Sequence, residues 1–192
     1  MRLLDPPHVH QWTHDEYYKM AEAGLFEGKH VELIEGRVIE MSPMGSAHAT
    51  GVSLASDTLR SVVGPGFLTR SQMPLDLGEL SEPEPDIAVV AGTARDYKNA
   101  HPEAAVLVVE VSESSLDYDR TEKASQYSAA GIPDYWVLNL IDRRLEVRRD
   151  PAPDPNQLYG FGYKSVMILE AGDFVSPLAA LQSSIAVADL LP

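Results

Sequence analysis

The sequence contains no cysteine among its 192 residues. That absence excludes a disulfide framework, a thiolate metal site and a cysteine nucleophile. The sequence also has no apolar run long enough to span a bilayer, and the N-terminal residues 1–7 break at Asp5 and two prolines before a signal-peptide core can form. We therefore expect a cytoplasmic protein with no membrane partner.

Basic residues are scarce as well. The chain has 15 Lys and Arg against 29 Asp and Glu, which gives a formal charge of −14. Proteins that grip a phosphate backbone usually carry a basic patch, so this charge argues against tight non-specific DNA binding by a monomer. The segment 76–86 holds five acids and no Lys or Arg. A solvated acidic loop and a metal-attracting approach to a site both fit that segment.

The order of the expected elements indicates an α/β (α+β) fold, in which helices flank a mixed β-sheet. Length and composition favour one domain over residues 1–192. Thr13 and Glu16 form a capping box that begins a first helix, and Glu35-Gly36 joins a short hairpin. Further helices are expected at 46–64, 119–130 and near 187–191. Strands are expected at 67–72, 75–77, 86–90, 105–111, 135–140, 144–149, 166–169 and 174–175, with a surface loop at 151–156.

Two carboxylates lie at the ends of candidate strands. Asp86 follows Pro85 at the start of one strand, and Glu110 interrupts the end of a continuous apolar run. If the two strands are adjacent and antiparallel, both carboxylates arrive at the same edge of the sheet. A Mg²⁺ or Mn²⁺ ion there can take one oxygen from each and keep several waters, one of them activated as a nucleophile. The backbone carbonyl of Val111 is a natural further ligand.

Other candidates have a structural alternative. Lys123 lies in the following helix, and it reaches the site only if that helix packs over the sheet. Asp86 after proline can simply shape a strand entry, whereas Glu110 must be solvated, paired or metal-bound. Glu32 alternates with apolar neighbours and can face a site or solvent. His48 begins the inward face of a helix and fits either a core histidine or a ligand.

Four strings together resemble the Uma family of restriction-endonuclease-like proteins, within the PD-(D/E)XK nuclease superfamily. They are Pro85-Asp86, Leu107 to Ser112, Asp119 to Lys123 and Gly131 to Val137. The similarity runs from the segment 32–36 through Met41-Ser42-Pro43 and His48 to 188–191. The resemblance implies a restriction-endonuclease-like sheet with an added N-terminal helix and hairpin and C-terminal strands.

The resemblance also implies roles for individual residues. Asp86 and Glu110 would be metal ligands, Lys123 the catalytic lysine, and Glu32 and His48 additional site residues. The usual superfamily lysine stands two residues after the second acid, where this sequence has Ser112. Lys123 would then take its place from the neighbouring helix.

The leading hypothesis is a Mg²⁺- or Mn²⁺-dependent DNA endonuclease, active as a homodimer because both strands of a duplex must be cut. A catalytically inactive nuclease fold that serves as a binding or dimerisation module is the alternative. A third hypothesis is a metal-dependent hydrolase acting on something smaller than duplex DNA, which would relieve the charge conflict.

Overall fold

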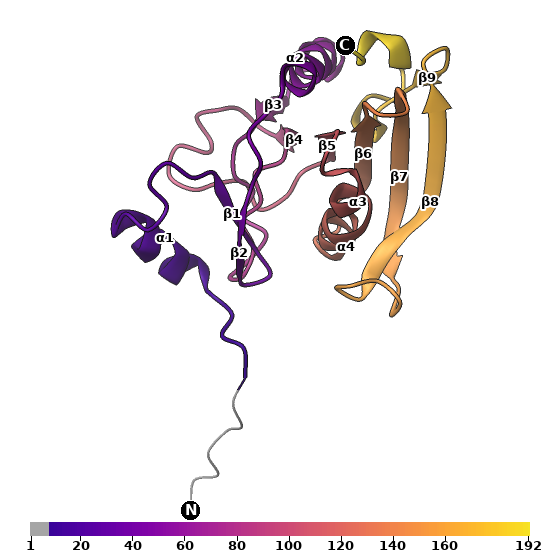
Figure 1. Cartoon of the computed structure of the whole chain (residues 1–192). Helices are drawn as coiled ribbons and strands as arrows, with labels where there is room; N and C mark the ends of the chain where they lie inside the picture. Colours follow the sequence, from indigo (N-terminus) through magenta and orange to yellow (C-terminus); the bar gives the residue numbers. More distant parts are fainter. Residues whose placement is uncertain (1–7) are drawn as a thin grey trace, which may run out of the picture. The chain divides into compact units, whose positions relative to one another are not determined.

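The computed structural model of the protein describes residues 8–192 (Figure 1). Residues 1–7, on which the expectation of no signal peptide rests, lie outside this range. The chain divides into two compact units, Met1–Ser42 with Asp76–Pro83 and Pro43–Leu75 with Glu84–Pro192. The expectation of one domain over 1–192 stays a prediction. Among residues 8–192, no helix combines the length and the apolar character that crossing a membrane requires.

The first unit contains the expected helix and hairpin. Helix α1 (His14–Glu22) begins after Thr13, whose backbone N–H donates to Glu16 Oε2 at 2.9 Å while its side chain accepts from the Glu16 N–H. Strands β1 (Val31–Ile34) and β2 (Arg37–Glu40) pair antiparallel. Their two-residue turn has φ of 48° at Glu35 and 73° at Gly36, the left-handed pair that a tight hairpin needs. The capping box and the hairpin are both confirmed.

The second unit is built on a six-stranded sheet in the order β3-β4-β5-β6-β7-β8. Only β5 and β6 are parallel, and a helical crossover joins them as parallel pairing requires. The expected mixed sheet is therefore confirmed. The strands are β3 (Phe67–Ser71), β4 (Ile87–Ala91), β5 (Leu107–Ser112), β6 (Asp134–Asn139), β7 (Arg144–Pro153) and β8 (Phe161–Glu170).

Helices cover both faces of this sheet. Helix α2 (Ser46–Val62) buries Val52, Ala55 and Leu59 in an apolar cluster with alternate residues of β4 to β7, including Trp136. The C-terminal segment adds to that cluster through β9 (Phe174–Val175), β10 (Ile185–Ala186) and the 3₁₀ turn η3 (Val187–Asp189), while the 3₁₀ turn η2 (Leu178–Ala180) lies between β9 and β10.

The crossover helix lies on the opposite face. It consists of α3 (Leu116–Tyr118), a π-helical stretch η1 (Asp119–Lys123) and α4 (Ala124–Ala129). Tyr127 of α4 packs against Tyr135 of β6 at a ring-centroid distance of 5.1 Å, and Tyr135 stacks on Tyr163 of β8 at 5.9 Å. An aromatic layer therefore joins the helix to this face of the sheet.

Several expected elements differ from the structure. The strand expected at 166–169 spans Phe161–Glu170, and the helix expected near 187–191 is a 3₁₀ turn. Residues 75–77 form a loop instead of a strand, and the Asp76 carboxylate caps it by accepting the Gly78 N–H at 3.1 Å. The expected loop from Pro151 begins as strand, because β7 continues to Pro153 opposite β8. Beyond Arg149, β7 pairs with β8 alone. A proline, which has no N–H group to donate, is tolerated there because one side of the strand needs no ladder hydrogen bond. The crossover helix begins at Leu116 instead of Asp119.

Candidate active site

Asp86 and Glu110 meet on one face of the sheet. Strands β4 and β5 pair antiparallel with Ile87 opposite Val109, so the register places Asp86 opposite Glu110 one residue further on. The Asp86 N–H donates to Glu110 Oε2 at 3.3 Å. Both residues are buried, with 8% and 3% of their surface exposed. Strands β4 and β5 are therefore adjacent and antiparallel, which is the condition under which the two carboxylates were expected to lie together.

Backbone and side-chain groups, Gln72 Nε2 at 3.4 Å among them, hold the Asp86 carboxylate. The Val111 N–H donates to Asp86 Oδ2 at 2.8 Å, which brings the backbone of that residue to the site, while the Val111 side chain lies in the core with α2. His48, in the first turn of α2, contacts Asp86 Oδ1 through Nε2 at 2.9 Å. This hydrogen bond raises the pKa of His48 above its ordinary value, against the opposing effect of desolvation. His48 is thus tied to Asp86 instead of being enclosed in the apolar core.

Lys123 reaches the second carboxylate from the crossover helix. Its ammonium donates to Glu110 Oε1 at 3.0 Å, and both side chains are almost fully buried. Tyr127, one turn later, donates its hydroxyl to the same oxygen at 2.7 Å. A buried carboxylate needs such partners because an isolated charge in the interior is costly. The crossover helix therefore packs over the sheet, which is the condition under which Lys123 was expected to reach the site.

Asp119 is a further buried acid beside this pair. Ser112 and Ser115 donate to its Oδ2 at 2.7 and 2.6 Å, which accounts for two serines of the segment 112–115 without a nucleophilic role. Burial raises the pKa of Asp119, and the positive charge of Lys123 opposes that rise. Sequence reasoning missed Asp119 because nothing in its spacing distinguishes it from a helix N-terminal acid.

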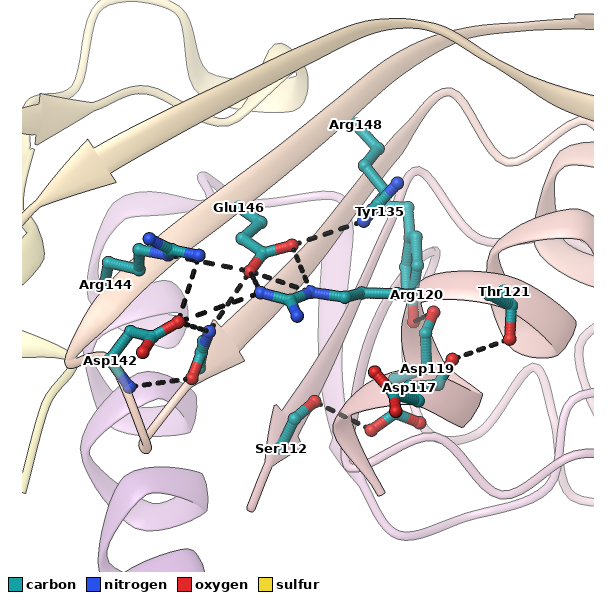
Figure 2. A network of polar contacts seen from close by, with 11 residues as sticks. Ser112, Asp117, Asp119, Arg120, Thr121, Tyr135, Asp142, Arg144, Glu146 and Arg148 are labelled. Carbon is teal, nitrogen blue, oxygen red and sulfur yellow. Dashed lines mark hydrogen bonds and ion pairs between the residues drawn. The ribbon is translucent and has the colours of Figure 1, made fainter. Parts of the chain in front are cut away.

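A second polar cluster lies on the same face, centred on Glu146 of β7 (Figure 2). Arg120 of η1 donates to it through Nε at 3.1 and 3.0 Å, and Asn139 and Arg148 donate at 3.2 Å each. Arg144 completes the cluster through Asp142, at 3.0 Å. Burial raises the pKa of Glu146, but the bonds from Arg120 and Asn139 outweigh it and leave that pKa below its usual range.

The π-helical stretch connects these two clusters. Asp119, Arg120 and Lys123 all belong to η1, and they contact Ser112, Glu146 and Glu110 of the sheet in turn. Short π-helical segments occur frequently at functional sites. Arg120 and Tyr127 share a helix face with Lys123 in the sequence pattern, which is the signal that could have identified both.

Glu32 lies in the first unit. It occupies β1 opposite Ile39 and is 1% exposed, so it does not face solvent. Its role as a site residue stays a prediction from the resemblance.

The donor set around Asp86 and Glu110 suits a hard cation. Carboxylate oxygens are the protein ligands that Mg²⁺ favours, and Mg²⁺ sites commonly use one or two carboxylates together with water and substrate phosphate. Within residues 8–192, no group of three or more His, Cys, Asp and Glu side chains is arranged to hold a metal ion. Asp86 and Glu110 offer two carboxylates of the kind that Mg²⁺ uses, without a third such side chain grouped with them among residues 8–192.

Comparisons with known proteins agree with this architecture. A solved structure from Anabaena variabilis, described as a "putative nuclease belonging to DUF820", superposes with a TM-score of 0.69 at 19% sequence identity. The match covers 93% of this chain and 96% of that one, and at this identity it establishes a shared nuclease-like fold. No curated protein matches the sequence. The Uma2 model, described as "Putative restriction endonuclease", matches residues 14–188, and the chain therefore belongs to the Uma2 family.

Proposed function

We propose that this protein is a Mg²⁺- or Mn²⁺-dependent endonuclease that hydrolyses phosphodiester bonds in DNA. The observation that carries the proposal is the buried pair Asp86 and Glu110 on adjacent strands, with the Lys123 ammonium 3.0 Å from Glu110. The family, described as "Putative restriction endonuclease", favours nucleic acid as the substrate, and the fold shared with a structure titled "putative nuclease" agrees with it.

Asp86 and Glu110 would hold the ion, with the Val111 carbonyl as a further ligand. When bound, such an ion supplies a Lewis acid for the scissile phosphate and lowers the pKa of a coordinated water. Asp86 Oδ2 and Glu110 Oε2 are both bonded by backbone N–H groups, so the protein fixes the orientation of both carboxylates before any ligand arrives. Such preorganisation lowers the reorganisation that accompanies reaction.

Lys123 supplies the positive charge of the site. Its ammonium lies beside Glu110 in a buried position, where an electrostatic interaction with a developing phosphate charge is stronger than in water. Tyr127 holds the same carboxylate oxygen and keeps Glu110 in place if the ammonium shifts toward a phosphate. The lysine comes from the crossover helix, while Ser112 stands at the usual lysine position and bonds Asp119 instead.

His48 and Glu32 would complete the site. His48 bonds Asp86 Oδ1, and this hydrogen bond raises the pKa of its imidazole and so favours the charged form. That position suits a residue that donates to a phosphate oxygen or orients Asp86. Glu32 is assigned to the site by the family resemblance alone.

The distribution of charge eases the conflict with a polyanionic substrate. Six of the 15 Lys and Arg residues lie within positions 120–149, against four acids there. The net charge of −14 is therefore concentrated elsewhere in the chain. Arg120, Arg144 and Arg148 surround Glu146 on the face that also carries Glu110.

Cleavage of supercoiled plasmid with Mn²⁺ tests the proposal. Wild type and the control Glu103→Ala, at an exposed loop position, should produce nicked and linear DNA, whereas Asp86→Asn and Glu110→Ala should not. Cleavage that persists in both site variants would defeat the assignment of these residues.

The alternative is a nuclease fold that binds without cutting. The acidic charge and the displaced lysine favour it. Wild-type protein that retains DNA in a gel-shift assay but leaves plasmid intact across Mg²⁺, Mn²⁺ and Co²⁺ would support the binding module instead.

A further inference from the structure

Strand β8 ends the sheet with a long apolar edge. It spans ten residues, and within the described range 8–192 only β7 pairs with it. Three consecutive apolar residues at its centre, Val166, Met167 and Ile168, are 48%, 37% and 46% exposed. Proteins usually protect such an edge with proline, charge, a bulge or a covering segment, because its unpaired N–H and C=O groups template another strand. Between Lys164 and Glu170 the sequence has no proline, glycine or charged residue.

We propose that β8 pairs antiparallel with β8 of a second copy of this chain, around a two-fold axis at Met167. This register places Lys164 opposite the partner's Glu170 and Val166 opposite the partner's Ile168. Directly opposed residues in an antiparallel pair share a face, so charge meets opposite charge at both ends and apolar side chains meet in the middle. The two six-stranded sheets then form one continuous sheet.

Neighbouring registers lack this complementarity. Two-fold symmetry requires opposed residues of the same parity, because only these lie on the same face of the sheet. An axis at Val166 sets Lys164 against the partner's Ile168, and an axis at Ile168 sets Glu170 against the partner's Val166. Each alternative places a charge opposite an apolar side chain, so the sequence of β8 favours Met167 as the centre.

Exposed apolar residues at both ends of β8 extend the surface. Leu158 precedes the strand and is 61% exposed, and Phe174 follows it at 65%. An antiparallel pairing brings the start of one β8 beside the end of the other, so each Leu158 segment lies next to a Phe174 segment of the partner. These contacts add apolar area to the main-chain hydrogen bonds, as a specific interface requires.

The pairing stands on the edge itself and does not depend on nuclease activity. A two-fold dimer would also supply two copies of the candidate site, one for each strand of a duplex. Its test needs neither metal nor DNA, so failure of the dimer and failure of the proposed function are separate results.

Sedimentation velocity over a range of about 1–100 µM measures the association. Wild type should shift from 21.0 kDa toward twice that mass. Ile168→Lys should raise the dimer dissociation constant at least about tenfold, because it places two lysines in the apolar centre. The control Ile141→Lys, at a 62% exposed position in the turn between β6 and β7, should leave it unchanged. A monomer at every concentration, or a dimer unaffected by Ile168→Lys, would overturn the proposal.

Charge reversal tests the register. Lys164→Glu and Glu170→Lys should each weaken the dimer, since each creates two like-charge pairs, and the double variant should restore wild-type affinity. Additive weakening in the double variant would contradict the register.

A single cysteine tests the axis directly, because the chain has none of its own. Opposed residues in an antiparallel pair have Cα atoms about 4.5–5.5 Å apart, within the range a disulfide spans. Met167→Cys should therefore form a covalent dimer under mild oxidation, and Ile141→Cys should not. Equal cross-linking of both variants would exclude an axis at Met167.

Discussion

At the scale of single residues, the candidate site contains one buried ion pair, between Lys123 and Glu110. Lys123 and Glu110 are both nearly inaccessible, so removing either side chain leaves the other buried without this ion pair. Breaking such a pair on one side typically costs about 3–5 kcal/mol, whereas replacing both partners is often close to neutral. The site is therefore tied to the stability of the whole second unit.

A double-mutant cycle measures that dependence. We expect Lys123→Met to lower the free energy of unfolding in urea by about 3 kcal/mol at neutral pH. Glu110→Gln should do the same, because it removes the charged carboxylate that the buried ammonium contacts. The double variant should recover most of the loss. Additive losses would show that the two side chains are not coupled.

Glu146 gives a pH dependence with a definite sign. Its folded pKa lies below the ordinary value of 4.5, so it contributes stability that is present above that pH and is lost as pH falls through the folded pKa. Glu146→Gln should therefore lower the free energy of unfolding by about 2 kcal/mol at neutral pH. The difference from wild type should shrink in acid. Urea unfolding between pH 3 and 7 checks this, with Glu103→Gln as the exposed control. A difference independent of pH would contradict it.

The sequence predicts the chemistry-bearing residues better than their partners. Asp86 and Glu110 stand out because a carboxylate in an apolar strand must be paired, solvated or metal-bound. The pairing of their strands brings the two residues together. Tyr127 shares only a helix face with Lys123, and Asp119 has no distinguishing pattern, since a tyrosine or an acid on a helix has many roles. Their contacts with Glu110 and Ser112 depend on how the helix packs, which no local pattern encodes.

Among the elements, α2 approaches the sheet closely at Gly51. A Cβ at this position would lie 3.0 Å from Val111 Cγ1, whose side chain is fully buried in the core. The same helix carries His48 and the same strand residue donates to Asp86, so this approach helps to set the spacing of the site.

Substitution of glycine by alanine tests the approach. Alanine favours a helix by about 1 kcal/mol over glycine, but overpacking a core costs about 1–3 kcal/mol. We expect Gly51→Ala to lower the free energy of unfolding by about 1 kcal/mol, since Val111 has little room to move. Gly64→Ala, where a Cβ meets nothing within 4 Å, should not lower it comparably. Thermal unfolding of both variants measures the difference, and a stabilised Gly51→Ala would contradict the close approach.

The elements that sequence periodicity misjudged are those set by tertiary contacts. The π-helical turn at 119–123 arises where three side chains of one segment contact three positions on the sheet, which helical periodicity cannot show. Prolines at 151 and 153 indicated a loop, yet the strand continues because one side of β7 is open there. The six-stranded sheet itself follows from the apolar runs, which is why its strands were predictable.

On the scale of the whole molecule, the charge of −14 governs how DNA would be bound. Counterion release makes binding depend on the number of phosphates contacted. If the basic residues of 120–149 make about three phosphate contacts, affinity should fall about ten- to hundredfold from 50 to 200 mM salt. Fluorescence anisotropy with a labelled duplex measures the slope. Binding that does not respond to salt would indicate an interaction without phosphate contacts.

The most direct measurement is Mn²⁺ binding by isothermal titration calorimetry, on wild type and on Asp86→Asn. Asparagine keeps the size of the side chain and can still accept the Val111 N–H, but it removes the charge that a divalent ion needs. We expect saturable Mn²⁺ binding in wild type, weakened at least about tenfold in Asp86→Asn and unchanged in Glu103→Gln. Binding of equal strength in all three proteins, or none in wild type, would contradict a metal centre at Asp86 and Glu110.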